Sequence, residues 1–99
     1  MIEAVVQVGT RETRYLRRGR GPHAVVVLAE SAGERVRLMR EVPGGCCVIA
    51  PVTDTLHDAD AAAFDSWLRG VIDGLGLDAP AIVLSPGMAW LAGYLDEAP

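Results

Sequence analysis

The sequence predicts an α/β fold built around a parallel sheet. Three short apolar runs, rich in β-branched residues, are typical of strands that are buried on both faces. Segments with helical spacing of apolar residues lie between them, and this alternation indicates a parallel sheet with right-handed crossovers. The 99 residues contain no internal repeat or linker, so we expect a single domain over residues 1–99.

An N-terminal β-hairpin is expected before the parallel strands. Its strands are Glu3–Val8 and Thr13–Arg18, and the loop Gly9–Glu12 joins them. Five arginines fall between positions 11 and 20, and we interpret them as charges that protect a solvated edge strand. The three buried strands then follow at Ala24–Leu28, Cys46–Ala50 and Ala81–Leu84.

Three helices complete the expected fold. The first is Ser31–Val42, with Val36 and Met39 inward and Arg35 outward. The second starts at Asp58 or Asp60 and ends at Gly76, and its apolar stripe consists of Phe64, Trp67, Leu68, Val71, Ile72 and Leu75. The third runs from Ser85 to about Asp96, with Met88 and Leu91 on its inner face.

Charge and cysteine content argue against several classes of function. The formal net charge is −4, lysine is absent and few aromatic residues accompany the arginines, so we expect no nucleic-acid partner. No apolar run approaches the ~20 residues of a membrane span, and the N-terminus lacks a signal-peptide pattern. Cys46 and Cys47 are adjacent, at no metal-ligand spacing from a histidine, which predicts buried free thiols and no metal or cofactor. We therefore expect a cytoplasmic protein.

Several motifs resemble the opening of α/β-hydrolases. Residues 15–22 (YLRRGRGP) look like the G-x-G-P turn that leads from a hairpin into the first parallel strand of that family. Residues 47–51 (CVIAP) resemble its next strand, and residues 64–68 (FDSWL) with 72–77 (IDGLGL) resemble the helix before its nucleophile strand. The resemblance covers nearly the whole chain. It implies a truncated, minimal three-layer version of that fold, a hairpin plus three parallel strands with three helices.

The catalytic positions of the resembled family are replaced. The serine of its G-x-S-x-G motif corresponds to Gly87. Its oxyanion segment corresponds to Ala29 and Glu30, where a carboxylate opposes developing negative charge. Val52 stands where the family often has Asp, and the family's acid and histidine follow later strands, before which this chain ends. The resemblance therefore implies a non-catalytic module that binds a protein or a ligand.

An alternative function remains open at Ser85. With His57 as base and Asp54 or Asp58 as acid, it would be the nucleophile of a small serine hydrolase at the carboxyl ends of the parallel strands. Because Pro86 follows, the simpler interpretation of Ser85, and the one we prefer, is a helix N-cap.

Glu30 and Gly87 are the candidate ligand-binding residues. Glu30 and Asp54 suit a general acid and base or the ligands of a hard cation, although solvated loop charges give the same pattern. Gly87 is expected to supply positive φ in a tight turn and, with the following helix, a cradle for an anion.

A homodimer is also expected. The strand Ala81–Leu84 is apolar, without lysine or internal proline, and the resemblance implies that it becomes an exposed edge. Val83, Trp90 and Tyr94 are the candidate interface residues. An unidentified protein is the alternative partner, and the other alternative is a monomer in which the last helix folds over this edge.

Overall fold

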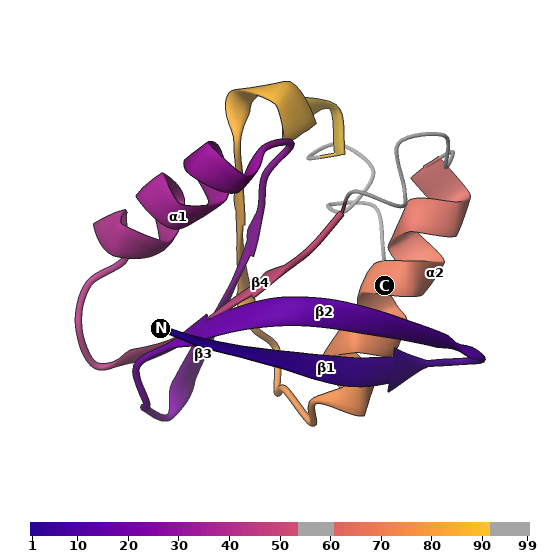
Figure 1. Cartoon of the computed structure of the whole chain (residues 1–99), viewed down its shortest axis with the longest axis horizontal. Coiled ribbons are helices and arrows are strands. Elements are labelled where there is room, and N and C mark those ends of the chain that lie inside the picture. Colours follow the sequence, from indigo (N-terminus) through magenta and orange to yellow (C-terminus); the bar gives the residue numbers. More distant parts are fainter. Residues whose placement is uncertain (54–60, 92–99) are drawn as a thin grey trace.

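The computed structural model describes residues 1–53 and 61–91, which form a mixed sheet with helices on both faces (Figure 1). The strands are β1 (Ile2–Val8), β2 (Arg11–Arg18), β3 (His23–Leu28), β4 (Cys46–Pro51) and β5 (Ala81–Leu84). The helices are α1 (Ala32–Glu41), α2 (Ala61–Gly74) and the short 3₁₀ helix η2 (Pro86–Leu91). The order of strands across the sheet is β1-β2-β4-β3-β5. Strand β3 runs parallel to β4 and β5, whereas β2 runs antiparallel to both of its neighbours.

The hairpin has a tighter turn than the four-residue loop that the sequence suggested. Val8 pairs with Arg11, so only Gly9 and Thr10 lie between the strands. Gly9 has φ of +62° and Thr10 does not have positive φ, which is the pattern of a type II′ turn with glycine at its first central position.

The assignment of the arginine-rich strand to the sheet edge was wrong. Strand β2 lies between β1 and β4, and the outer strand is β1, which carries no arginine. The arginines are accommodated because their charged ends leave the sheet for partners or solvent. Nη1 of Arg14 lies 3.6 Å from Oε1 of Glu3 on β1. Arg18 donates a hydrogen bond from Nη2 to the carbonyl of Val42, just after α1.

The alternation of β3 divides the core into two clusters. Val25 and Val27 face α1, whereas Val26 and Leu28 face α2, which explains why the whole run is apolar. Around the α1 side gather Ala29, Leu38, Met39, Val48 and Ala50. Around the α2 side gather Val6, Phe64, Trp67, Leu68, Val71 and Met88.

Helix α1 departs from the expected orientation at one residue. Ser31 caps it, since its Oγ accepts a hydrogen bond from the amide of Glu34 at 3.2 Å. Met39 is buried as expected, but so is Arg35, whose exposed fraction is only 4%. The placement of Arg35 on the outer face was therefore wrong: it lies three residues before Leu38, which is also buried, and shares that face of the helix.

Helix α2 confirms the apolar stripe that the sequence predicted. Phe64, Trp67, Leu68 and Val71 are buried, and Gly76 follows the helix with φ of +65°. Either proposed start, Asp58 or Asp60, lies outside the described residues. Two glycines four residues apart bring α2 close to β1, because a side chain at Gly70 or Gly74 would collide with Val8 or Val6.

The expected third α-helix is not found in the described residues. Residues 86–91 form a 3₁₀ helix, in which the amide of Met88 donates to the carbonyl of Ser85 at 2.9 Å. Both helix types place residues i and i+3 on one side, so the spacing of Met88 and Leu91 could not distinguish them. Residues 92–96 of the predicted helix lie outside the described part.

Candidate functional site

The segments that follow the three parallel strands lie at the same end of the sheet, at the carboxyl ends of the neighbouring strands β4, β3 and β5. Glu30 follows β3, Thr53 follows β4 and Ser85 follows β5. From β3 the chain crosses one face through α1 to reach β4, and from β4 it crosses the other face through α2 to reach β5 (Figure 1). The connections thus lead to opposite sides of β3, and such a switch point is where open α/β sheets bind ligands.

Glu30 and Gly87 lie in direct contact at this point. A Cβ atom added to Gly87 would collide with the carboxylate of Glu30, so the acid occupies the space into which a side chain at position 87 would extend. The structure therefore brings the two candidate ligand-binding residues together. The carboxylate of Glu30 therefore fills the space beside the backbone of Gly87.

The positive φ expected at Gly87 was wrong. Among the described glycines, positive φ occurs at Gly9, Gly19, Gly45 and Gly76 only. The strand-to-helix turn is made instead by a 3₁₀ turn with ordinary backbone angles, so backbone conformation does not require glycine at position 87. A larger residue there would have to displace the exposed side chain of Glu30. A strained nucleophile turn, of the kind that the resembled family uses, is not formed here.

Ser85 lies two residues before Gly87 and is fully buried. Its exposed fraction is 0%, and its Oγ has no hydrogen-bond partner within the part of the chain that the structure describes. Its backbone is fully engaged, since the amide donates to Leu28 and the carbonyl accepts from Met88, both at 2.9 Å. The expected side-chain cap is therefore not formed, because the chain turns into a 3₁₀ helix bonded through the Ser85 carbonyl.

Thr53 holds the ends of β3 and β4 together and was not singled out from the sequence. Its side chain is buried and its Oγ1 donates to the carbonyl of Ala29 at 3.0 Å. This bond fixes the backbone just before Glu30. A single threonine after a strand carries no motif, so no sequence signal identified it.

The remaining candidate residues divide into two groups. Asp54, His57 and Tyr94 lie outside the described residues, and Trp90 is placed only through the backbone of η2.

Within residues 1–53 and 61–91 there is no group of three or more His, Cys, Asp or Glu that could hold a metal ion. Cys46 and Cys47 are free thiols as predicted, although half-buried and not fully buried.

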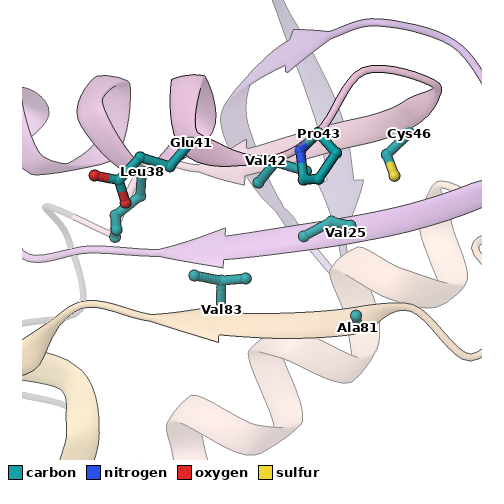
Figure 2. A pocket seen from close by; sticks show the side chains of 8 residues that line it. All are labelled: Val25, Leu38, Glu41, Val42, Pro43, Cys46, Ala81 and Val83. Carbon is teal, nitrogen blue, oxygen red and sulfur yellow. The ribbon is translucent and has the colours of Figure 1, made fainter.

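A second feature lies on the α1 face, away from the switch point. An apolar hollow of about 300 Å³ opens between the end of α1 and strands β3 and β5 (Figure 2). Val25 and Val83 point into it from the two strands, and Leu38 and Val42 border it from the α1 side. Its other lining residues are Glu41, Pro43, Cys46 and Ala81. The predicted interface residue Val83 thus borders a hollow, and no sequence pattern indicates the shape of this hollow.

No helix in the described residues has both the length and the apolar character needed to cross a membrane.

Comparison with known proteins gives a likeness of fold. No family model and no curated protein matches the chain. Among solved structures, it is similar to the epoxide hydrolase VrEH1 from Vigna radiata, with a TM-score of 0.70 and 17% sequence identity. The match covers 95% of this chain but 34% of that chain, so the present sequence spans about a third of the epoxide hydrolase. The protein thus has a mixed α/β fold that resembles part of an α/β-hydrolase.

Proposed function

We propose that this chain is a non-catalytic α/β-hydrolase-like module that acts by binding. The observation that carries the proposal is the contact between Glu30 and Gly87. Position 87 corresponds to the nucleophile of the resembled family, and there the chain has no side chain to attack a substrate. The carboxylate of Glu30 occupies the space into which a side chain at position 87 would extend.

The charge of Glu30 adds a second argument against acyl transfer. A tetrahedral intermediate carries negative charge that hydrogen-bond donors must stabilise, and loss of one such donor typically costs a factor of about 10²–10³ in rate. Glu30 follows the strand that supplies this segment in the resembled family, and a carboxylate beside the reacting carbonyl repels the developing charge. Glycine at position 87 and glutamate at position 30 thus both disfavour acyl transfer.

The alternative, a serine hydrolase that uses Ser85, gains no support from the position of that residue. A nucleophile must approach its substrate within about 3–3.5 Å, and the Ser85 side chain is wholly buried. Its proposed partners, His57 and Asp54, are not among the described residues. We therefore retain binding as the proposed function.

Hydrolysis of simple acyl esters tests the proposal. The wild-type protein is compared with Ser85→Ala and with Ser66→Ala, a control at an exposed serine on α2. Folding of each variant is checked by circular dichroism. We expect the three proteins to hydrolyse the ester at the same background rate. Turnover that is lost in folded Ser85→Ala but kept in Ser66→Ala would overturn the proposal and establish the hydrolase.

An epoxide is the second substrate of this test, because the similar solved structure is an epoxide hydrolase. We expect no conversion above the uncatalysed rate, since no side chain at position 87 can open the ring. Epoxide opening by the wild-type protein at a rate proportional to its concentration would contradict the non-catalytic assignment.

A further inference from the structure

We propose that a second copy of this chain covers the outer edge of β5 and the apolar hollow beside it, forming a two-fold dimer. The inference deepens the proposed binding role by naming its partner. It can fail independently, because ester hydrolysis tests catalysis whereas the oligomeric state tests the dimer.

As far as the structure describes the chain, one edge of strand β5 is unpaired and carries no charged residue. It pairs with β3 on one side, and within residues 1–53 and 61–91 no strand pairs with its other side. Ile82, Val83 and Leu84 are only half-buried, although each is apolar. No charged residue occurs between Asp78 and Leu91. Natural edges are commonly protected by charges, and this one lacks them.

The hollow suits an apolar protein surface better than a small ligand. Binding sites for small molecules combine apolar walls with a few polar groups that fix orientation. Among the described residues that line this hollow, Glu41 alone is charged, and its Oε1 accepts a hydrogen bond from Nη1 of Arg37 at 3.1 Å. The lining residues that the structure describes include no hydroxyl, amide or basic side chain that would orient a ligand.

The backbone of β5 indicates how two copies would pair. The amide of Ser85 donates to Leu28 on β3, so residues 81, 83 and 85 direct their backbone groups to β3. The N–H and C=O groups of Ile82 and Leu84 consequently point to the open edge. Antiparallel pairing of Ile82 with Leu84 of a second copy, and the reverse, satisfies all four groups on each strand.

Two prolines select this register. Pro80 and Pro86 lack an N–H and bracket a window of which Val83 is the centre. A two-fold axis through that centre places Val83 opposite Val83 of the second copy. Shifting the axis to Ile82 would pair Leu84 with Pro80 and leave the Leu84 carbonyl without a donor. The charged residue nearest to the strand in sequence, Asp78, lies five positions from the axis, so like charges do not meet.

The size of a stable interface requires the hollow as well as the strand edge. A typical dimer buries about 800 Å² on each copy, roughly a seventh of the 5763 Å² exposed by this chain. A few paired residues cannot supply this area alone. Because Val83 and Ala81 belong both to β5 and to the lining of the hollow, pairing at the edge brings the second copy against the open side of the hollow (Figure 2).

Light scattering after size exclusion tests the dimer and its location. We expect the wild-type protein at micromolar concentration to have twice the chain mass of 10.5 kDa. Val83→Lys is expected to weaken the dimer roughly tenfold or more. Val5→Lys, the same change on the exposed face of the opposite edge strand β1, should leave it intact. If Val83→Lys does not fold, Ala81→Arg replaces it, because Ala81 is exposed.

Disulfide crosslinking tests the register. Residues opposite each other at a non-hydrogen-bonded antiparallel site have Cα atoms about 4.5 Å apart, within the range of a disulfide. Val83→Cys should therefore crosslink two copies on oxidation, whereas Ile82→Cys should not. Cleavage at arginine places residue 83 in the fragment 70–99, which contains no native cysteine. Mass spectrometry can thus identify the bond.

Three results would overturn the proposal. The first is a wild-type protein that stays monomeric. The second is a dimer that resists both Val83→Lys and Ala81→Arg. The third is crosslinking through Ile82→Cys without crosslinking through Val83→Cys.

Discussion

The carboxylate of Glu30 occupies the space that a side chain at position 87 would need. Glu30 lies in the loop after β3 and Gly87 in the 3₁₀ helix η2 after β5, and they meet at the switch point of the sheet. Thr53 holds the backbone before Glu30 in place through its bond to Ala29. Glycine at position 87 and glutamate at position 30 are therefore coupled, and a change at one should alter the effect of a change at the other.

Replacing Gly87 with Ala measures this coupling. In the wild-type background the new Cβ must displace the Glu30 carboxylate, whereas in a Glu30→Ala background the space is free. Because φ at Gly87 is not positive, the backbone itself accepts alanine. We expect the two effects on the free energy of unfolding to differ by roughly 0.5–2 kcal/mol, as measured by denaturant titration.

Gly44→Ala is the matched control, since nothing lies within 4 Å of its added Cβ. Its effect should be the same with and without Glu30. Equal effects of Gly87→Ala in both backgrounds would show that the two residues are not coupled.

Sequence patterns predicted best the elements in which apolar spacing, length and flanking residues all favour the same structure. The apolar run of β3 is short, rich in β-branched residues and preceded by Gly and Pro, which together favour a strand covered on both faces. The stripe from Phe64 to Val71 has the spacing of a helix with one buried side. The order of strands does not follow from such patterns. Strand β2 lies between β1 and β4, although its arginines suggested an edge strand. This position is possible because a long arginine side chain can place its charged end outside the sheet.

The candidate site was predictable in its residues but not in its geometry. The order of motifs aligned Glu30 and Gly87 with the oxyanion and nucleophile positions of a known fold. That the acid fills the space at Gly87, and that Ser85 is wholly buried, depends on side-chain packing between loops distant in sequence. No local pattern records such contacts.

Leu68 anchors α2 in the core and provides a test of that packing. Its exposed fraction is 2%, and it lies in the cluster with Phe64 and Val71. Leu68→Ala should lower the free energy of unfolding by ~2–5 kcal/mol, because it removes buried methyl groups and leaves a cavity. Ser66→Ala, at an exposed position on the same helix, should change stability by less than ~0.5 kcal/mol. A loss below ~1 kcal/mol for Leu68→Ala in a denaturant melt would show that this face is not core.

Arg18 connects β2 to the end of α1. Its guanidinium donates to the carbonyl of Val42, which follows the last turn of the helix, where a positive charge is favourable. Arg18→Met keeps much of the aliphatic stem and removes the donor, and we expect a loss of about 1 kcal/mol. Arg20→Met, at an exposed loop position, is the control. Equal melting temperatures for the two variants would contradict a structural role for the Arg18 bond.

Thr13 and Trp67 form a buried hydrogen bond between the hairpin and α2. The indole Nε1 of Trp67 donates to Oγ1 of Thr13 at 3.0 Å, and both residues are buried. Thr13→Val keeps the shape of the side chain but leaves the indole N–H without its acceptor. We expect this change to cost about 1–3 kcal/mol in the free energy of unfolding.

A double-mutant cycle separates that bond from the packing around it. Trp67→Phe removes the hydrogen-bond donor and reduces the buried side-chain volume, so this single substitution already destabilises the protein. Once the donor is absent, Thr13→Val should cost little, because a valine no longer leaves a buried polar group unsatisfied. The cost of Thr13→Val in the Trp67→Phe background should thus fall by roughly 1 kcal/mol or more. If Thr13→Val costs the same in both backgrounds, the hydrogen bond does not stabilise the contact between α2 and the hairpin, and apolar packing alone holds these elements together.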